Sequence, residues 1–262
     1  MSFRERRNWE AALAPLLDDA HGALWRAHCD ALHEGLLSRW LERERFARAL
    51  KTDLYDEALG DGLVAPLSQR AESVVGIDLA ANVVRAAQIR HRGLCSVQAD
   101  VRRLPFAAGS FDLVVSNSTL DHFSRRAEIE TALREIHRVT THDGRLLLTL
   151  DNLANPAVAL RNALPLRWLR RVGLVPYPVG ATLGPRGLQR LLRRVGFEVC
   201  DTDAVLHCPR AIVVARARRL QRRNPTSTHA AFLHRLRRWE RLATWPTRFV
   251  TGYFIAVHAR KR

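Results

Sequence analysis

Residues 52–63, TDLYDEALGDGL, decide the fold class, because they join two stretches of the chain with different patterns. Residues 49–55 are typical of an extended strand, and residues 63–71 are typical of a helix. The glycine pair in Gly60–Gly62 therefore predicts a turn from a strand into a helix. Without a side chain, glycine lets the backbone pass close to a ligand, and turns of this kind hold nucleotide-like ligands in many proteins.

Beyond this turn, short apolar strands alternate with amphipathic helices. Helical patterns over 79–91 and 124–139 separate the strands. The alternation predicts an α/β fold with a doubly wound, Rossmann-like, mostly parallel sheet and helices on both faces. The expected elements also include VVGID at 74–78, LCSVQAD at 94–100, FDLVVSN at 111–117, RLLLTLD at 145–151, a helix over 188–195, a strand over 197–206, a basic helical segment and a last strand GYFIAVHA at 252–259.

We expect the chain to divide into an N-terminal helical cap over residues 1–47 and a main domain over 48–262. Leucines and tryptophans recur at helical spacing through 8–47, which indicates one apolar face. Residues 152–183 interrupt the rhythm of strands and helices with four prolines and several aromatic side chains. We interpret this segment as a lid over the substrate.

The composition is that of a globular protein: 262 residues, of which 47% are hydrophobic. The four cysteines are far apart and include no Cys-x-x-Cys pair, so we expect reduced thiols and no metal site. No apolar run reaches the roughly 18 residues of a membrane span, and the first residues lack the pattern of a secretory signal. These features predict a cytoplasmic protein without a transmembrane segment.

The net charge of +16 comes almost entirely from arginine, because lysine occurs only at Lys51 and Lys261. A basic excess can mark a nucleic-acid partner. The arginines are nevertheless spread over most helical segments, and the densest run, RARRLQRR at 216–223, is typical of a solvated helix face. The charge therefore favours a solvated surface, with nucleic-acid binding as the alternative.

Three acidic residues are expected where strands end: Asp56, Asp78 and Asp100. In an open parallel sheet, the carboxyl ends of the strands meet at one edge, so we expect these carboxylates to line one crevice. An acid about twenty residues past a glycine turn is placed to accept hydrogen bonds from a ribose diol. A single nucleoside-containing ligand could therefore contact all three.

Two cofactor classes use this geometry. The letters GDGLVA can be aligned with the dinucleotide fingerprint, but Asp61 would then repel the pyrophosphate. S-adenosylmethionine carries a ribose, a sulfonium and an ammonium but no phosphate, so acidic neighbours suit it. The pattern therefore favours S-adenosylmethionine.

The ordered series of motifs resembles the class I S-adenosylmethionine-dependent methyltransferases over about residues 48–151. The more specific parts are DVRRLPFAAGSFDLVVSNSTLDHF at 100–123 and LREIHRVTTHDGRLLLTLDN at 133–152. DEALGDG also follows the family's first motif, with Ala58 in the place of the first glycine. The resemblance implies that the cofactor contacts Asp56, Ala58, Gly60, Gly62, Asp78, Leu79, Asp100, Val101, Asn117 and Ser118, where Asp78 binds the ribose, Asp100 and Val101 the adenine, and Asn117 and Ser118 the methionine part.

Candidate catalytic and substrate residues follow the later strands. His122 is a candidate general base beside the transferred methyl group, and Asp121 is a second candidate; the alternative is that Asp121 caps a helix and His122 is packed. Asp151 and Asn152 end a strand at the ligand edge and are candidate substrate contacts. Arg161 and Tyr177, in the expected lid, are further candidates.

The sequence thus predicts an enzyme that transfers a methyl group to a small-molecule acceptor. The apolar lid with its arginines favours an acceptor that is apolar or carries a carboxylate. The alternatives are an RNA methyltransferase, which the basic charge supports, and a cofactor-binding protein of the same fold without turnover. Peripheral membrane contact through residues 159–177 would accord with a lipid-like acceptor.

Overall fold

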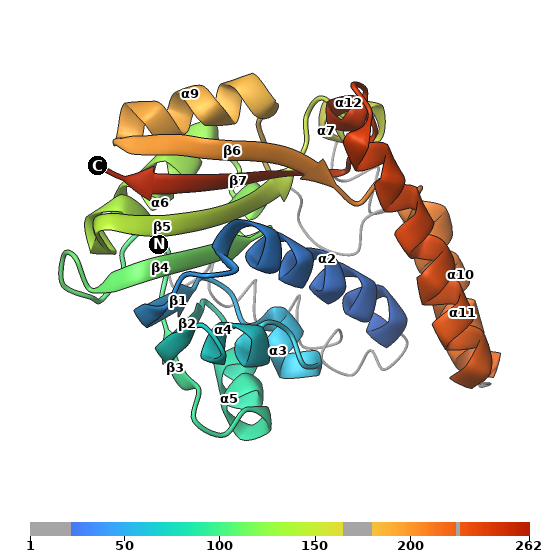
Figure 1. Ribbon diagram of the computed structural model, residues 1–262, viewed down its shortest axis with the longest axis horizontal. Helices are drawn as coiled ribbons and strands as arrows, with labels where there is room; N and C mark the ends of the chain where they lie inside the picture. The colour runs from blue at the N-terminus through green and yellow to red at the C-terminus, as the bar shows by residue number, and fades with distance from the viewer. Residues whose placement is uncertain (1–21, 165–179, 224–225) are drawn as a thin grey trace.

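The computed structural model describes residues 22–164, 180–223 and 226–262, and a seven-stranded sheet lies at its centre (Figure 1). The strand order is β3-β2-β1-β4-β5-β7-β6. The strands are β1 (Phe46–Lys51), β2 (Ala71–Asp78), β3 (Cys95–Gln98), β4 (Phe111–Asn117), β5 (Thr140–Asp151), β6 (Phe197–Val205) and β7 (Phe254–Lys261).

The sheet is parallel except at β7. Strands β3, β2, β1, β4 and β5 pair in parallel, whereas β7 runs antiparallel to both of its neighbours, β5 and β6. The chain order reverses between β1 and β4, which makes their carboxyl ends the topological switch point. In open α/β sheets, ligands bind beside this point. The predicted fold class, a mostly parallel and doubly wound sheet, is confirmed.

Each face of the sheet is buried by a separate layer of helices. On one face lie α2 (Ala23–Leu41), α4 (Val64–Ser68) and α5 (Ala81–Arg90), and α10 (Arg210–Arg223) and α11 (Thr226–Arg237) pack against α2 beyond the strand ends (Figure 1). On the other lie α6 (Arg126–Val139) and α9 (Pro185–Val195).

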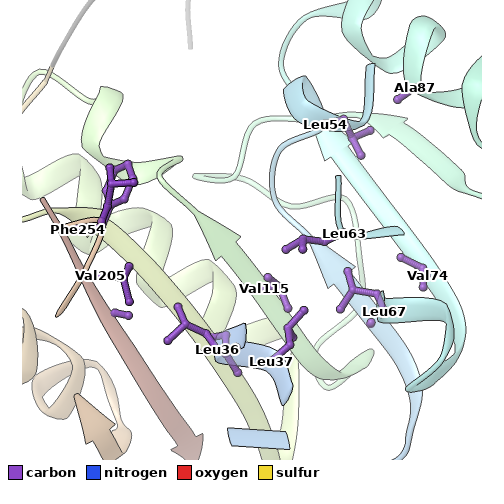
Figure 2. Packing of buried hydrophobic residues seen from close by; sticks show 14 of the residues in the cluster. Leu36, Leu37, Leu54, Leu63, Leu67, Val74, Ala87, Val115, Val205 and Phe254 are labelled. Carbon is purple, nitrogen blue, oxygen red and sulfur yellow. The ribbon is translucent and has the colours of Figure 1, made fainter. Parts of the chain in front are cut away.

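Successive side chains along a strand point to opposite faces of the sheet, so each strand contributes to both apolar layers. Ala49 belongs to the first cluster and its neighbour Leu50 to the second. Figure 2 shows the first cluster, where Leu36 and Leu37 of α2 approach Val115 of β4. The sheet therefore forms the middle layer of a three-layer domain.

The start of the sheet differs from the sequence prediction. Phe46 and Ala47, expected in the helical cap, already belong to β1, and β1 ends at Lys51 rather than near Tyr55. Tyr55 begins a short helix, α3 (Tyr55–Leu59). The strand stops there because Leu54 turns inward: its side chain is fully buried, and its backbone amide donates to the Asp78 carboxylate.

Several shorter helices connect the later strands. They are the 3-10 helix η2 (Leu120–His122), α7 (Pro156–Ala163), the 3-10 helix η3 (Arg238–Thr244) and α12 (Arg248–Thr251). Residues 152–164 and 180–183 of the expected lid are described, while 165–179 lie outside the described residues. None of the described helices is both long and apolar enough to cross a lipid bilayer.

Candidate functional site

A buried ion cluster closes the carboxyl end of β1. The Lys51 ammonium, at the last position of the strand, lies 3.0 Å from Glu57 Oε2 and 3.2 Å from Asp53 Oδ2. It also donates to the carbonyl oxygen of Asp53 at 2.8 Å. Although burial disfavours the charged amine, the Asp53 and Glu57 carboxylates hold the pKa of Lys51 above its usual range. Lys51 therefore stays charged and stabilises two carboxylates beneath the ligand edge.

A chain of hydroxyl groups joins β1 to β4 across the switch point. Thr52 Oγ1 donates to Ser116 Oγ at 2.8 Å and lies 3.0 Å from Thr119 Oγ1. Thr119 Oγ1 lies in turn 3.2 Å from Asp53 Oδ2. The chain links the hydroxyls to the ion cluster, so one continuous polar network holds the loops that follow β1 and β4.

Asp78, at the end of β2, has the environment expected of a ribose-binding acid. Its Oδ1 accepts the Ala80 amide at 2.9 Å, and its Oδ2 accepts the Leu54 amide at 3.1 Å. A carboxylate oxygen has two lone pairs, so each oxygen keeps capacity for a ligand hydroxyl. Burial raises the pKa of Asp78 to about 6, against the opposing effect of the two amides. The two amides therefore hold the carboxylate in place, and hydrogen-bond donors from a ligand would compensate the cost of its burial.

The glycine turn does not lie where the sequence predicts it. Gly60 and Gly62 stand between α3 and α4, and His91 Nε2, just past the C-terminal end of α5, lies 3.0 Å from the Gly60 carbonyl oxygen. Helix α5 begins three residues after Asp78, so His91 marks its far end, about 15 Å along the axis. The strand-to-helix turn predicted here is wrong, because α3 intervenes.

The space around the glycines also differs from a ligand cradle. A Cβ atom on Gly62, whose φ is 53°, would lie 2.4 Å from Glu57 Oε1. Gly62 thus makes room for a protein carboxylate that accepts the Leu63 amide at 2.9 Å. Asp61, between the glycines, is exposed. The arrangement accounts for Gly62 through packing and backbone conformation, whereas a Cβ atom on Gly60 would make only an ordinary contact, 3.6 Å from the Asp56 carbonyl oxygen.

Asp56 and Ala58 lie on α3 rather than at the end of a strand. Asp56 therefore does not follow β1 directly, and the prediction of three acids at strand ends is wrong for this residue. Burial raises the pKa of Asp56 well above its usual range, and the nearby carboxylates of Asp30 and Asp53 raise it further. Ala58 packs in the apolar cluster under α2. Asp53 is the acid that follows β1 most closely.

Asp100 follows β3 and is fastened to Arg102. The guanidinium approaches both carboxylate oxygens, with Nη2 at 2.9 Å from Oδ2, and the Arg102 amide donates to Oδ1 at 2.9 Å. Burial raises the pKa of Asp100, but the bonds from Arg102 outweigh it and the net pKa is lowered. Val101 is buried in the core. Asp100 is thus ionised and half-buried past the end of β3, where Gln98 Nε2 donates to the Leu79 carbonyl oxygen at 3.0 Å.

The loop after β4 places Ser118 and Asn117 beside β5. Ser118 has φ of 49°, the left-handed region that a residue other than glycine seldom adopts. Its amide donates to the Thr149 carbonyl oxygen at 2.9 Å, and its Oγ donates to Asp121 Oδ2 at 2.8 Å. Asn117 lines a small cavity between α2 and the sheet. These bonds hold the loop in its strained conformation at the ligand edge.

A second buried cluster lies at the ends of β4 and β5. Asp121 Oδ2 accepts the Asp151 amide at 2.9 Å, and Asp151 Oδ2 lies 2.7 Å from Arg161 Nη2. Arg161 Nη1 donates to the Tyr253 hydroxyl at 2.7 Å. Burial and the neighbouring Asp121 raise the pKa of Asp151, which Arg161 partly offsets. Within the described part of the chain, Oδ1 of Asp121 and Oδ1 of Asp151 have no hydrogen-bond partner.

The remaining predicted residues have distinct surroundings. Asn152 is fully buried, and its side-chain amide donates to the carbonyl oxygens of Phe249 and Gly252, which explains it as an anchor for the segment before β7. His122 is half-buried at the end of η2. Asp121 does not cap a helix, because its carboxylate bonds to Ser118 and Asp151 instead. Tyr177 lies outside the described residues.

The structure brings some predicted residues together and adds others. Asp121, Asp151 and Arg161 form one cluster, whereas Gly60 and Gly62 lie apart from Asp78. Lys51 was not among the residues predicted from the sequence, although a lysine at the end of an apolar strand, in a chain with only two lysines, was an available signal. The other residues of these networks that were not predicted are Thr52, Asp53, Glu57, Ser116, Thr119 and Tyr253.

Comparison with known proteins agrees with the fold and the geometry of the site. Residues 55–148 match the methyltransferase domain family. The fold resembles that of solved methyltransferase structures. Residues 55–148 therefore resemble a methyltransferase domain, as the sequence predicts, and the chain has the fold of these solved methyltransferases. Both likenesses indicate S-adenosylmethionine as the cofactor.

Particular relatives agree with this class. A demethylmenaquinone methyltransferase of Corynebacterium kroppenstedtii is 30% identical over 156 residues, 58% of this chain and 65% of the relative. A malonyl-[acyl-carrier protein] O-methyltransferase of Erwinia billingiae is 36% identical over 83 residues, 30% of this chain and 32% of the relative. The chain thus spans less than two thirds of the length of either relative.

Two solved structures resemble the whole chain more closely in shape than in sequence. The N-methyltransferase NodS of Bradyrhizobium japonicum, in complex with S-adenosyl-L-homocysteine, superposes with a TM-score of 0.58 at 14% identity and covers 97% of this chain and 98% of its own. The geranyl diphosphate C-methyltransferase of Streptomyces coelicolor gives 0.57 at 15% identity, with 88% and 77% covered. At these identities, the likeness establishes the fold.

Proposed function

We propose that this protein transfers a methyl group from S-adenosylmethionine to a small-molecule acceptor. The observation that carries the proposal is Asp78, which ends β2 of a class I sheet with its carboxylate buried, held by two amides and still able to accept further hydrogen bonds. A ribose diol has the two donors that would compensate this burial.

In this proposal, different residues at the edge bind different parts of the cofactor. Asp78 takes the ribose hydroxyls, Asp100 and Val101 lie toward the adenine, and Asn117 with Ser118 lies toward the methionine part. Asp56, Ala58, Gly60 and Gly62 shape the floor through packing rather than by contact. Asp53, which the Lys51 ammonium holds at 3.2 Å, adds a carboxylate that suits a positively charged ligand.

Methyl transfer mainly requires that the acceptor be aligned with the methyl group of the cofactor. S-adenosylmethionine, when bound, supplies an electrophilic methyl carbon on a sulfonium. The protein orients the acceptor in line with that carbon and excludes water. Ser118 and its rigid loop define where the acceptor lies relative to β4. If the acceptor must lose a proton, His122, at the end of η2 near this loop, is the candidate base.

The acceptor end of the site is the cluster of Asp121, Asp151 and Arg161. The names of the two relatives give their acceptors as demethylmenaquinone and malonyl-[acyl-carrier protein]. These are an apolar ring and a carboxylate, and both agree with a small-molecule acceptor that is apolar or carries a carboxylate. The segment 152–183 serves as the lid in this proposal, within a catalytic domain over 48–262 that acts in the cytoplasm.

The alternative functions would require different properties of the surface and of the site. An RNA methyltransferase would need the basic surface to bind structured RNA beside the edge, and a non-catalytic protein would bind the cofactor without turnover. The small-molecule function is favoured because demethylmenaquinone, which the name of one relative gives as its acceptor, is a small molecule, and because the ligand edge is acidic at Asp53, Asp78 and Asp100.

Isothermal titration calorimetry with S-adenosyl-L-homocysteine tests the cofactor assignment. Asp78→Asn should weaken binding by about 1–3 kcal/mol, the scale of a lost bond to a charged group. Glu72→Gln is the matched control, because Glu72 is exposed on the same strand at its other end. Affinity that is unchanged in Asp78→Asn, with both variants folded, would remove Asp78 from the site; no binding by the wild-type protein would remove the function.

A further inference from the structure

The helices between β6 and β7 carry most of the net charge of the protein. Residues 204–251 contain eleven arginines and a single acidic residue, Glu240. The Glu240 carboxylate is engaged within the fold, where it accepts the backbone amides of Leu206 and His207, both at 3.1 Å. Arg248 of α12 also pairs with Asp203 of β6, with Nε 3.6 Å from Oδ1. Two engaged acids cannot neutralise eleven arginines, so the outer surface of α10, α11, η3 and α12 is strongly cationic.

Exposed apolar side chains gather on the same elements. The described residues include six exposed large hydrophobic side chains, and five of them lie on these helices, in the turn before α12, or on the neighbouring α7. The sixth, Ile89, lies on α5. The two tryptophans, Trp239 and Trp245, are 45% and 58% exposed. The five are Leu160, Ile212, Trp239, Trp245 and Val250.

The chain connections place this surface beside the ligand edge. Helix α7 follows β5, α10 follows β6, and α12 precedes the antiparallel β7, so all three join the sheet at the edge where β5 ends. Figure 1 shows α7, α10, α11 and α12 grouped beyond the arrowheads of β5 and β6. Leu160 directly precedes Arg161, which pairs with Asp151. The exposed surface therefore adjoins the acceptor end of the site.

Tryptophan and arginine side chains line a hollow in this surface, which we name the Trp–Arg surface. Its lining consists of Arg235, Arg238, Trp239, Arg241, Leu242 and Trp245. Tryptophan indoles favour the boundary between headgroups and acyl chains in a bilayer, and arginines near an anionic leaflet are attracted to it. The two residue types together match the chemistry of an anionic lipid surface.

We propose that the Trp–Arg surface docks this protein on an anionic lipid bilayer, with the ligand edge near the membrane. Nucleic acid would also attract arginine and stack on tryptophan. It would leave the aliphatic Leu160, Ile212 and Val250 in water, however, whereas a bilayer buries aliphatic and aromatic side chains alike. The docking goes beyond the proposed methyl transfer and does not depend on it.

Co-sedimentation of the full-length protein with vesicles tests the proposal. Vesicles of phosphatidylglycerol and phosphatidylcholine in equal amounts should pull the protein down at low salt, and vesicles of phosphatidylcholine alone should bind it much less. Replacing Arg235, Arg238 and Arg241 by glutamine should reduce the partition coefficient by about fivefold for each arginine, from the attraction of one basic residue to an anionic surface. Trp239→Ser with Trp245→Ser should also reduce it, at unchanged charge.

Two control variants separate docking from net charge and from general stickiness. Arg186, Arg190 and Arg193, all on α9, replaced by glutamine remove the same charge from another face. Ile89→Ser removes an exposed apolar side chain far from the surface. Both controls should bind vesicles like the wild type, and thermal melts should show every variant folded.

Three results would overturn the proposal. The first is wild-type protein that does not bind anionic vesicles at low salt. The second is an equal loss in the α9 control, which would make the attraction a matter of net charge. The third is wild-type protein that binds a structured RNA more tightly than the vesicles and loses that binding in the arginine variant, which would assign the surface to nucleic acid.

Discussion

The two halves of the ligand edge compensate their buried charges differently. At the ends of β1 and β2, Lys51 lies within ion-pair distance of Asp53 and Glu57, and backbone amides hold Asp78. At the ends of β4 and β5, the buried Asp151 pairs with the Arg161 guanidinium, and its backbone amide donates to the buried Asp121. In the first half, the Lys51 ammonium pairs with the buried Glu57, and Asp78 keeps acceptor capacity for a ligand. In the second, one oxygen each of Asp121 and Asp151 is left without a hydrogen-bond partner among the described residues.

The difference assigns separate roles to the two halves. A buried charge without compensation is costly, and proteins keep such groups mainly where a ligand or a reaction uses them. The β1–β2 half should therefore respond to mutation mainly in stability, apart from Asp78 itself. The β4–β5 half should respond in the handling of the acceptor.

The largest effect should follow removal of the buried cation in the first half. Lys51→Met would leave Glu57 and Asp53 buried without their partner, and we expect a loss of about 3–5 kcal/mol in the free energy of unfolding. Urea denaturation measures it. The double variant Lys51→Met with Glu57→Gln should recover much of the loss, because the glutamine would bring no charge and could still accept the Leu63 amide through its side-chain oxygen. Equal losses in the single and double variants would contradict the role of Lys51.

The second prediction concerns the other half. Arg161→Met would leave Asp151 beside Asp121 without its ion-pair partner. We expect about 2–4 kcal/mol of destabilisation, with cofactor affinity nearly unchanged and turnover of an identified acceptor strongly reduced.

Arg145→Met is the matched control for this change. Arg145 lies on β5 and pairs with Glu44 at 2.8 Å, but both side chains are partly exposed. An exposed pair contributes about 0–1 kcal/mol, so the control should cost little. If Arg161→Met instead abolished cofactor binding, the division of the edge into two halves would be wrong.

The structures of the two halves were not equally predictable from the sequence. The strand FDLVVSN at 111–117 and Asp78 at the end of β2 were predicted correctly, because alternation and burial leave a clear pattern in apolar strands. The turn at Gly60 was misplaced, because the five-residue α3 is too short to produce helical periodicity. The bonds of Asp121 to Ser118 and Asp151 were not predictable, since they depend on the left-handed conformation of Ser118 and on long-range packing.

The third prediction sharpens the assignment of the glycine turn. Gly62→Ala should destabilise the protein by about 1–3 kcal/mol, since the residue has a positive φ and a Cβ atom would meet Glu57. Gly109→Ala is the control, because its φ of 64° is similar but a Cβ atom there meets nothing within 4 Å. Gly62→Ala should cost more than the control and leave cofactor affinity intact. A loss of affinity in Gly62→Ala at little cost in stability would restore the turn as the cofactor cradle.

The smallest effect concerns pH. Burial raises the pKa of Asp78 to about 6, so the carboxyl group loses its proton as the pH rises through that value. A carboxylate accepts hydrogen bonds from a ribose better than the protonated acid does. Affinity for S-adenosyl-L-homocysteine should therefore rise between about pH 5 and pH 7 by up to about tenfold. Calorimetry of Asp78→Asn over the same range should show no such rise; a parallel rise in the variant would assign the titration to another group.

A crystal structure of the protein with S-adenosyl-L-homocysteine tests the central claim most directly. The account predicts that both ribose hydroxyls lie within hydrogen-bond distance of the Asp78 carboxylate, at the switch point between β1 and β4. It also predicts that the sulfur points toward Ser118 and the Asp121–Asp151 pair. A ligand whose ribose lies against Gly60 and Asp61, or away from the carboxyl edge of the sheet, would contradict the account.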